Sequence, residues 1–258
     1  MSPSFARIAP RYDALRPLSS ADRARLEGML RDARLAAGDL IVEVGCGTGR
    51  LTLPLAALTP ARVVGVDAEA RMLEVARVKD ATGRVEWMRG SAYRLPLPDQ
   101  AAALVVMVMV VHLLRQRGRA FAEARRVLRE AGRLSLWTFT PRHVADFYLN
   151  PYFPSIPMID RPRFPAVEVL ALELRRAGFD QVRVEMRDEV RHLDLAEVVD
   201  RVRGRYISTL SMLPPLEYRL GLQRLEELLA QGRSTTLTQR SEWALITART
   251  AAAESGTD

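Results

Sequence analysis

The feature that most constrains this chain is a short apolar run that ends near an acidic residue and then breaks into glycines. The stretch Ile41–Arg50 reads Ile-Val-Glu-Val-Gly-Cys-Gly-Thr-Gly-Arg, and a helix-compatible segment, residues 51–58, follows directly. Glycine suits such a turn because it adopts positive φ and lets a ligand approach bare backbone. A strand, a glycine-rich loop and a helix start in this order predict a pocket for an adenosine-containing cofactor.

The spacing of the glycines separates two classes of cofactor. A dinucleotide-binding loop reads G-x-G-x-x-G, and its third glycine lets the helix pack closely on the strand. Here the glycines are Gly45, Gly47 and Gly49, and Arg50 stands where that third glycine is required. A nicotinamide-dependent oxidoreductase is therefore disfavoured.

A second apolar run, Arg62–Val66, also ends in a carboxylate, Asp67. Asp67 follows Gly45 at close to the separation of about 20 residues expected of an acid that accepts hydrogen bonds from a ribose. The alternative is that Asp67 caps the helix predicted over residues 69–79. The neighbouring glycine loop favours the ribose.

Length and composition fit one domain that carries a lid. The chain has 258 residues, of which 48% are hydrophobic, so it can bury a sizeable core. No apolar run reaches the length of about 18 residues needed for a membrane span, and no signal-peptide pattern occurs, so a cytoplasmic location is expected. Cys46 is the only cysteine, which excludes an intrachain disulfide. Within the glycine loop we interpret it as a small packing residue with a useful backbone amide.

The net charge of +7 permits a nucleic-acid partner but does not indicate one. Lys79 is the only lysine, and the arginines are spread along the chain instead of being gathered in one block. Proteins that bind nucleic acids usually cluster their basic residues on one face. A nucleic-acid partner is therefore not expected.

Short apolar strands alternate with helical patterns over residues 40–190, which predicts βαβ units. We expect an α/β, Rossmann-like fold with a seven-stranded, mostly parallel sheet covered by helices on both faces. The predicted strands are residues 40–44, 62–66, 84–89, 104–109, 133–139, 181–186 and 243–248. Two of the predicted helices span residues 119–129, ended by Gly132, and residues 165–177, ended by Gly178.

Three segments fall outside this alternation and predict a helical lid. Residues 1–37 form a helical prelude, and residues 141–163 are rich in proline and aromatic residues. Residues 191–240 form a helical insertion, within which a helix over residues 216–230 places its leucines on one side. These leucines are Leu216, Leu220, Leu225, Leu228 and Leu229. Long insertions on an α/β core usually carry substrate recognition.

Four motifs, residues 42–49, 66–73, 90–99 and 125–134, occur in one order along the chain. In this order they resemble the class I S-adenosylmethionine-dependent methyltransferases, in particular small-molecule methyltransferases related to ubiquinone and menaquinone biosynthesis enzymes. The resemblance runs from about residue 9 to residue 248. The chain departs from the family's pattern at four positions. These are Ser91, where an aspartate is common; Ala102 and Ala103, in place of a phenylalanine and an acid; and Leu113, in place of a second histidine.

The resemblance implies that the cofactor is S-adenosylmethionine and the product S-adenosylhomocysteine. Glu43 then faces the cofactor's ammonium or the loop amides, because a buried carboxylate without a partner is costly, and Asp67 takes the ribose hydroxyls. Ala68 and Met72 pack on the adenine, while Ser91 and Ala92 read its edge. The backbone of Val108 lies near the sulfur, and Tyr12 closes over the cofactor or merely anchors the prelude. The glycine loop contributes Gly45, Cys46, Gly47 and Arg50.

Methyl transfer from a sulfonium depends on alignment and on exclusion of water, and alignment alone supplies about 7–11 kcal/mol. No cluster with metal-ligand spacing occurs in the sequence, so no metal site is expected. A nitrogen or oxygen acceptor needs a general base. His112 is the first candidate, because it follows the strand predicted over residues 104–109, and His143 is the second. The alternative is that His112 is a loop residue without a chemical role.

Neither insertion carries a motif that identifies the acceptor. Arg201, Arg203, Arg205 and Tyr206 cluster in the late insertion, where they bind an anionic substrate or form a solvated helix face. Residues 147–153 form an apolar acceptor pocket or cover the sheet edge. The sequence predicts a methyltransferase that acts on a small molecule. A nucleic-acid or protein methyltransferase and a non-catalytic cofactor-binding protein are the alternatives.

Overall fold

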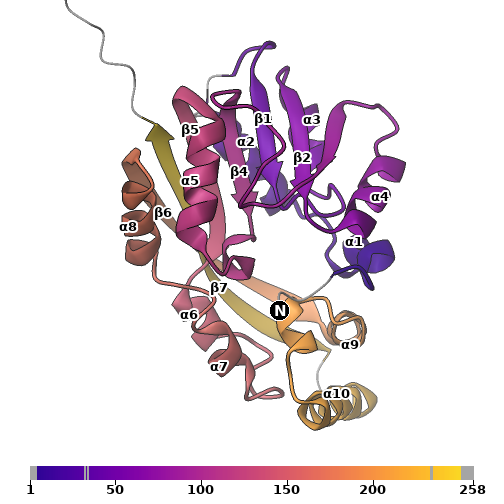
Figure 1. Ribbon diagram of the computed structural model, residues 1–258. Helices are drawn as coiled ribbons and strands as arrows, with labels where there is room; N and C mark the ends of the chain where they lie inside the picture. Colours follow the sequence, from indigo (N-terminus) through magenta and orange to yellow (C-terminus); the bar gives the residue numbers. More distant parts are fainter. Residues whose placement is uncertain (1–4, 32, 34, 233–234, 251–258) are drawn as a thin grey trace, which may run out of the picture.

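The computed structural model describes residues 5–31, 33, 35–232 and 235–250, which form a central sheet with helices around it (Figure 1). The strands are β1 (Leu40–Val44), β2 (Arg62–Asp67), β3 (Val85–Arg89), β4 (Ala102–Val108), β5 (Leu128–Phe139), β6 (Phe179–Asp194) and β7 (Thr236–Thr250). The longer helices are α2 (Ser20–Arg31), α4 (Ala70–Lys79), α5 (Arg117–Val127), α8 (Val167–Arg176), α9 (Leu195–Arg203) and α10 (Pro215–Ala230). The shorter ones are η1 (Ala9–Arg11), α1 (Tyr12–Leu15), α3 (Thr52–Ala57), η2 (Val111–Leu113), α6 (Pro141–Ala145), α7 (Ile156–Asp160) and η3 (Ser208–Ser211).

The sheet has seven strands in the order β3-β2-β1-β4-β5-β7-β6. Strands β1 to β5 run parallel to one another, whereas β7 is antiparallel to both β5 and β6. The predicted α/β, Rossmann-like fold with a mostly parallel sheet is therefore confirmed. Because β1 to β5 are parallel, their carboxyl ends meet at one edge, which is where ligands bind in sheets of this kind.

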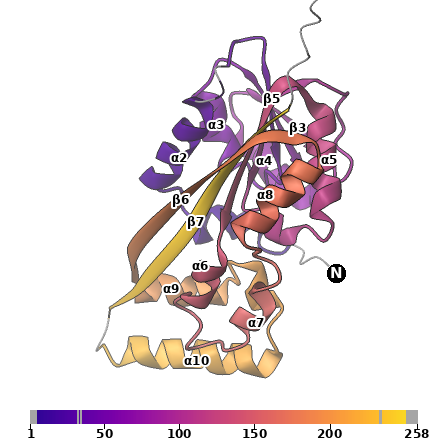
Figure 2. The ribbon, with the colours of Figure 1, turned by 90° about the vertical axis from the view of Figure 1, so that its left-hand side faces the viewer.

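Two apolar clusters cover the two faces of the sheet. On one face Ile41 and Leu104 pack against α2 and α3, and on the other Val42 and Val105 pack against α5 and α8. Figure 2 shows these helix pairs on opposite sides of the strands. Strand β4 is buried along its whole length, as expected of a strand between two helical layers.

A third apolar cluster lies beyond the sheet and forms the core of a lid. It draws its buried side chains from residues 147–156, from α9 and from residues 210–225. Figures 1 and 2 show α6, α7, α9 and α10 gathered at one end of the molecule, which β6 and β7 reach by extending past the other strands. The two insertions expected to carry substrate recognition therefore pack together as one body.

The bounds predicted for the insertion, residues 191 and 240, are both wrong. Strand β6 continues to Asp194 and β7 begins at Thr236, and these two residues pair with each other. The strands predicted over residues 181–186 and 243–248 are only parts of β6 and β7. The polar ends were missed because β6 is an edge strand with mostly exposed side chains, so its sequence does not show the alternation of a half-buried strand.

The predicted end of the helix over residues 119–129 is also wrong. Helix α5 ends at Val127, and Leu128 takes an extended conformation and pairs with Ala102 of β4. Gly132 lies within β5 and does not end the helix. Gly178, by contrast, follows α8 closely and has a φ of 86°, as expected of a residue that ends a helix.

The leucines of α10 do not share one side of the helix. Leu225 is buried, and Leu228 and Leu229 pack on the lid core. Leu216 and Leu220 are 59% and 44% exposed. Tyr218 and Gly221 occupy the buried face in their place, so the apolar stripe follows residues that the leucine pattern does not reveal.

The predicted prelude contains η1, α1 and α2, while residues 1–4, 32 and 34 of that prelude lie outside the described part of the chain. In the described ranges, no helix is both long enough and apolar enough to cross a bilayer.

Gly221 is the point where α10 meets the aromatic segment of the lid. A Cβ atom there would lie 2.2 Å from the ring of Phe153 and 2.6 Å from the carbonyl oxygen of Tyr152. We predict that Gly221→Ala lowers the free energy of unfolding by about 1–3 kcal/mol, because overpacking outweighs the better helix propensity of alanine.

The matched control is Gly28→Ala in α2, where no heavy atom lies within 4 Å of the added Cβ. Helix propensity alone then raises the free energy of unfolding, by up to about 1 kcal/mol. Urea denaturation of both variants measures the difference. Equal stabilisation by the two substitutions would contradict the packing of α10 on residues 152–153.

Candidate active site

A pocket of about 780 Å³ lies between the carboxyl ends of the parallel strands and the lid. Its size is within the usual range for small-molecule and cofactor sites. Every residue predicted for the cofactor, together with the first candidate base, lines it: Tyr12, Glu43, Gly45, Cys46, Gly47, Arg50, Asp67, Ala68, Met72, Ser91, Ala92, Val108 and His112. The chain therefore brings these residues together, although their individual roles stay predictions.

The loop between β1 and α3 forms one wall of the pocket. Gly45, Gly47 and Gly49 have φ angles of 75°, 56° and 71°, in the region that favours glycine. A Cβ at Gly45 would lie 2.4 Å from the Val110 side chain, whereas one at Gly47 would meet nothing within 4 Å. The loop thus needs glycine for its turn and leaves bare backbone open to the pocket at Gly47.

Asp67 ties the end of β2 to this loop. Its Oδ2 accepts a hydrogen bond from the Gly47 amide at 2.8 Å, and its Oδ1 accepts one from the Glu69 amide at 2.8 Å. Burial raises the pKa of the Asp67 carboxyl. Because each carboxylate oxygen can accept more than one hydrogen bond, both oxygens keep capacity for hydroxyl donors in the pocket.

The alternative role of Asp67 as a helix cap is partly realised. Helix α4 begins at Ala70, and Glu69 is its N-cap residue. The bond from the Glu69 amide to Asp67 spans two residues, which is the pattern of an Asx turn leading into a helix. This turn uses one oxygen and so leaves room for the ribose role.

Glu43 lies at the end of β1 and is 3% exposed. It accepts one hydrogen bond, from Thr52 Oγ1 at 2.6 Å. Burial is the main cause that raises the pKa of Glu43 to about 7, and the nearby Asp67 carboxyl adds to it. Within the described residues no loop amide donates to Glu43, and the Arg50 guanidinium acts against the rise of its pKa. The contact of Glu43 with the cofactor's ammonium stays a prediction.

Arg50 lies beside a carboxylate, and Cys46 is buried near two carboxylates. The Arg50 guanidinium lies 3.3 Å from Asp22 and is largely shielded from solvent. Burial, together with the Glu43 and Asp67 carboxyls, raises the pKa of the Cys46 thiol. Cys46 therefore stays a neutral thiol at neutral pH and is unsuited to act as a nucleophile.

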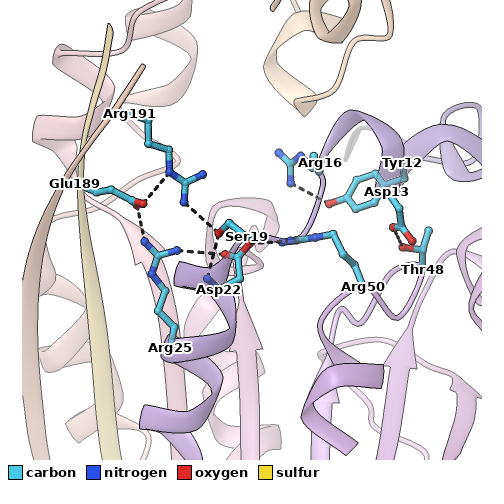
Figure 3. A network of polar contacts seen from close by, with 10 residues as sticks. All are labelled: Tyr12, Asp13, Arg16, Ser19, Asp22, Arg25, Thr48, Arg50, Glu189 and Arg191. Carbon is cyan, nitrogen blue, oxygen red and sulfur yellow. Dashed lines mark hydrogen bonds and ion pairs between the residues drawn. The ribbon is translucent and has the colours of Figure 1, made fainter. Parts of the chain in front are cut away.

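The prelude is clamped to the glycine loop by a group that sequence reasoning missed. Asp13 accepts a hydrogen bond from Thr48 Oγ1 at 2.5 Å and forms an ion pair with Lys79 (Figure 3 draws the Asp13–Thr48 contact). Lys79 also donates to the Thr48 carbonyl oxygen at 2.7 Å. These contacts hold α1 against the loop and place Tyr12 in the pocket wall. In the sequence, the only indication of this role for Asp13 is its position next to Tyr12.

A second polar network crosses the pocket from α2 to β6 (Figure 3). Arg25 lies 4.5 Å from the ring centroids of Trp137 and of Trp243 and pairs with both Asp22 and Glu189. Asp22 also joins Arg50 of the glycine loop. The loop, the prelude and the extension of β6 are therefore linked through charges that lie far apart in the sequence.

Both candidate bases are shielded from solvent: His143 is buried, and His112 is half-buried. His112 lies in η2 just after β4, and its ring stacks on Phe164 at 4.7 Å. Its Nδ1 is buried and has no hydrogen-bond partner in the described part of the chain. Burial, with the Arg163 and Arg16 guanidiniums, holds the pKa of His112 well below its usual value. Burial lowers the pKa of His143 to about 4.

The predicted substrate-binding cluster of the late insertion is split by the structure. Arg201 and Tyr206 line the pocket. Arg203 instead pairs with Glu226 on α10, and Arg205 lies 3.6 Å from the ring centroid of Tyr218. Arg203 and Arg205 therefore lie away from the pocket, and the exposed Arg203 fits the alternative of a solvated helix face, because successive residues at the end of α9 point in different directions.

The aromatic segment lies partly in the pocket wall and partly in the lid core, so it does not serve simply as a cover for the sheet edge. Phe147 and Tyr148 line the pocket, whereas Phe153 is buried in the lid core against Tyr218.

Within the described residues, no group of three or more His, Cys, Asp or Glu side chains is placed to hold a metal ion.

Comparison with known proteins places the chain in a family. A family model described as a methyltransferase domain matches residues 42–136. A ubiquinone/menaquinone biosynthesis C-methyltransferase of Geotalea daltonii is 30% identical over 166 residues, which cover 59% of this chain and 71% of that protein. The chain belongs to the class I S-adenosylmethionine-dependent methyltransferases. The resemblance inferred from four sequence motifs is thus confirmed, and S-adenosylmethionine is the cofactor of this family.

Two further comparisons show how much of the chain resembles known methyltransferases. A ubiquinone/menaquinone biosynthesis C-methyltransferase of Syntrophotalea carbinolica is 36% identical over 143 residues, which cover 54% of this chain and 60% of that relative. The phosphoethanolamine N-methyltransferase 2 of Haemonchus contortus, solved with phosphomonomethylethanolamine and S-adenosylhomocysteine, matches with a TM-score of 0.64 at 17% identity. That match covers 95% of this chain and 57% of the other. At this identity the likeness supports the fold.

The raised pKa of Glu43 predicts a pH dependence of cofactor binding. With a pKa of about 7, Glu43 is mostly protonated at pH 6 and mostly ionised at pH 8. If Glu43 faces the cofactor's ammonium, S-adenosylhomocysteine binds roughly tenfold more weakly at pH 6 than at pH 8, because the carboxyl must first lose its proton. Isothermal titration calorimetry at both pH values, in buffers of different ionisation enthalpy, measures the affinity and the proton released.

Glu43→Gln is the matched variant, since it keeps the shape of the side chain and cannot ionise. We expect weak binding with no rise between pH 6 and pH 8. The same pH dependence in Glu43→Gln and in the unaltered protein would show that another group titrates.

Proposed function

We propose that this chain transfers the methyl group of S-adenosylmethionine to a small-molecule acceptor by in-line displacement. The observation that carries the proposal is a pair of carboxylates, the buried Glu43 and the half-buried Asp67, at the ends of neighbouring strands beside an open glycine loop. A ligand that presents an ammonium and ribose hydroxyls would satisfy both. The names of the two bacterial relatives, both C-methyltransferases of quinone biosynthesis, support a small-molecule acceptor.

The cofactor would lie along the tips of β1, β2 and β4. Glu43 would face its ammonium, the glycine-loop amides and Arg50 its carboxylate, and Asp67 its ribose. The remaining lining residues would hold the base and the sulfur: Ala68 and Met72 on the adenine face, Ser91 and Ala92 at the adenine edge, Val108 near the sulfur, and Tyr12 as a cover.

When bound, S-adenosylmethionine supplies a methyl group already activated by a positively charged sulfur. The chain's own contribution is therefore alignment and exclusion of water, which together can account for about 7–11 kcal/mol. The prelude, clamped by Asp13, and the lid, which contributes Phe147 and Tyr148, enclose the pocket from opposite sides. This enclosure favours an acceptor small enough to be covered.

His112 is the residue best placed to accept a proton from the acceptor. Its Nδ1 has no partner in the described part of the chain, and its lowered pKa keeps the imidazole neutral at physiological pH. A weakly basic imidazole suits an acceptor whose proton becomes acidic as the bond to the methyl group forms.

Four earlier predictions stay open beside this proposal. A nucleic-acid or protein methyltransferase and a non-catalytic cofactor-binding protein are alternatives that an activity assay distinguishes. The single-domain organisation and the cytoplasmic location also stay predictions.

The test is methyl transfer from labelled S-adenosylmethionine to a panel of phenols, amines and enols, with tRNA and a basic protein as competing acceptors. We expect product with at least one small molecule. His112→Gln lowers turnover of an oxygen or nitrogen acceptor by about 10²–10⁴-fold, because the general base is lost. The control is His192→Gln, since His192 lies on β6 outside the pocket and contacts Thr238.

Turnover of tRNA or protein alone would favour the first alternative. Tight cofactor binding with no product from any acceptor would favour the second. Equal turnover in both histidine variants would show that His112 is not the general base.

A further inference from the structure

The arginines that line the pocket differ in whether a carboxylate already neutralises them. Most pair with one: Arg25 and Arg50 with Asp22, Arg191 with Glu189, and Arg201 with Glu197. Arg16 is the exception, because none of the described carboxylates lies within ion-pair distance of it. The dashed line from Arg16 in Figure 3 leads to the Tyr12 hydroxyl and to no acid.

Arg16 lies between the cofactor side of the pocket and the lid. It donates a hydrogen bond to the Tyr12 hydroxyl at 2.9 Å, and its guanidinium carbon lies 5.3 Å from the Tyr12 ring centroid. The same carbon lies 5.8 Å from the ring centroid of Tyr206, which follows α9. Stacking on two rings holds the guanidinium in place, and a guanidinium carries five donors, so several remain for a ligand.

A row of aromatic rings runs along the lid side of the pocket and ends beside Arg16. Successive ring centroids in this row lie between 3.7 and 6.5 Å apart, in the order His112, Phe164, Phe139, His143, Phe147 and Tyr148. The Tyr148 hydroxyl then lies 2.8 Å from the Tyr206 hydroxyl. All of these residues line the pocket. A wall of ring faces and edges favours a flat, apolar ligand.

Asp160, an acidic residue of the lid that lines the pocket, does not neutralise Arg16. Asp160 lines the same part of the pocket but pairs with Arg163 at 2.6 Å and accepts from the Thr209 hydroxyl. Its charge is therefore balanced within the lid. Of the guanidiniums near the aromatic row, Arg163 is paired with Asp160, whereas Arg16 has no carboxylate partner among the described residues.

We infer that the acceptor is a flat aromatic molecule that carries a carboxylate, and that Arg16 binds this carboxylate while the ring system lies along the row from His112 to Tyr148. A single guanidinium without a second unpaired arginine matches a singly charged carboxylate better than a doubly charged phosphate. The inference rests on the proposed function, because it takes the aromatic side of the pocket as the acceptor side. The competing role for Arg16 is to bind the carboxylate of the cofactor.

Calorimetry on protein saturated with S-adenosylhomocysteine tests this inference with two matched probes, naphthalene-2-carboxylate and its neutral amide. We expect the acid to bind at least about tenfold more tightly than the amide, the size of one charge-assisted hydrogen-bonded contact. Arg16→Gln should reduce this preference to less than about twofold, and Arg16→Lys should keep part of it, since a point charge replaces the planar fork.

The control is Arg11→Gln, from the same segment, since Arg11 is exposed, pairs with Asp200 and does not line the pocket. It should keep the full preference for the acid. Affinity for S-adenosylhomocysteine, measured for every variant, reports both folding and the cofactor site, and should be unchanged in Arg16→Gln.

Equal affinity for acid and amide, or no binding of the acid at millimolar concentration, would overturn the inference. A loss of S-adenosylhomocysteine affinity in Arg16→Gln, with the folded state confirmed by thermal unfolding, would assign Arg16 to the cofactor and overturn it as well. Failure of the unaltered protein to bind S-adenosylhomocysteine would instead count against the proposed function.

Discussion

The site depends on two carboxylates, one buried and one half-buried, at the ends of adjacent parallel strands. Register places Val44 opposite Val66, so Glu43 and Asp67 end neighbouring strands at the same edge of the sheet. Burial raises the pKa of both groups, and the Asp67 carboxyl raises the pKa of Glu43 further. Asp67 is stabilised by two backbone amides, whereas Glu43 has one hydroxyl donor. A cationic ligand would balance the negative charge of these carboxylates.

The pocket joins two parts of the molecule with separate cores. The cofactor side is built on the sheet, whose two faces are packed by α2 and α3 and by α5 and α8. The acceptor side is built on the lid, which has its own apolar cluster. Polar contacts connect the two: Asp13 and Lys79 hold the prelude on the glycine loop, and Arg25 links α2 to β6. Substitutions in the lid can therefore change the acceptor side without disturbing the strands that carry Glu43 and Asp67.

Sequence patterns predicted the sheet and the cofactor side because both depend on local order. The run Leu40–Val44 is an observed strand with the predicted bounds, and the positive φ of Gly45 and Gly47 follows from the turn that the spacing demanded. The same local reasoning correctly brought Asp67 to the pocket. Parallel strands share one edge, so residues that follow each strand must lie near one another.

The lid side was predicted less well because its geometry depends on long-range packing. The exposed Leu216 and Leu220 show that leucine spacing alone did not define the buried face of α10, since Tyr218 and Gly221 fill it. Leu128 leaves the helical pattern because it pairs with Ala102 in β4. Arg16 has no motif, and its position is set by two tyrosines, Tyr12 and Tyr206, from opposite ends of the chain.

The most direct test of the account is the affinity of Asp67→Ala for S-adenosylhomocysteine, measured by calorimetry beside Asp99→Ala, whose carboxylate is exposed and outside the pocket. Loss of hydrogen bonds to an ionised carboxylate should weaken binding by roughly 1.5–3 kcal/mol in Asp67→Ala and leave Asp99→Ala unchanged. Unchanged affinity in Asp67→Ala, or saturation of the same pocket by NADH in place of S-adenosylhomocysteine, would contradict the account.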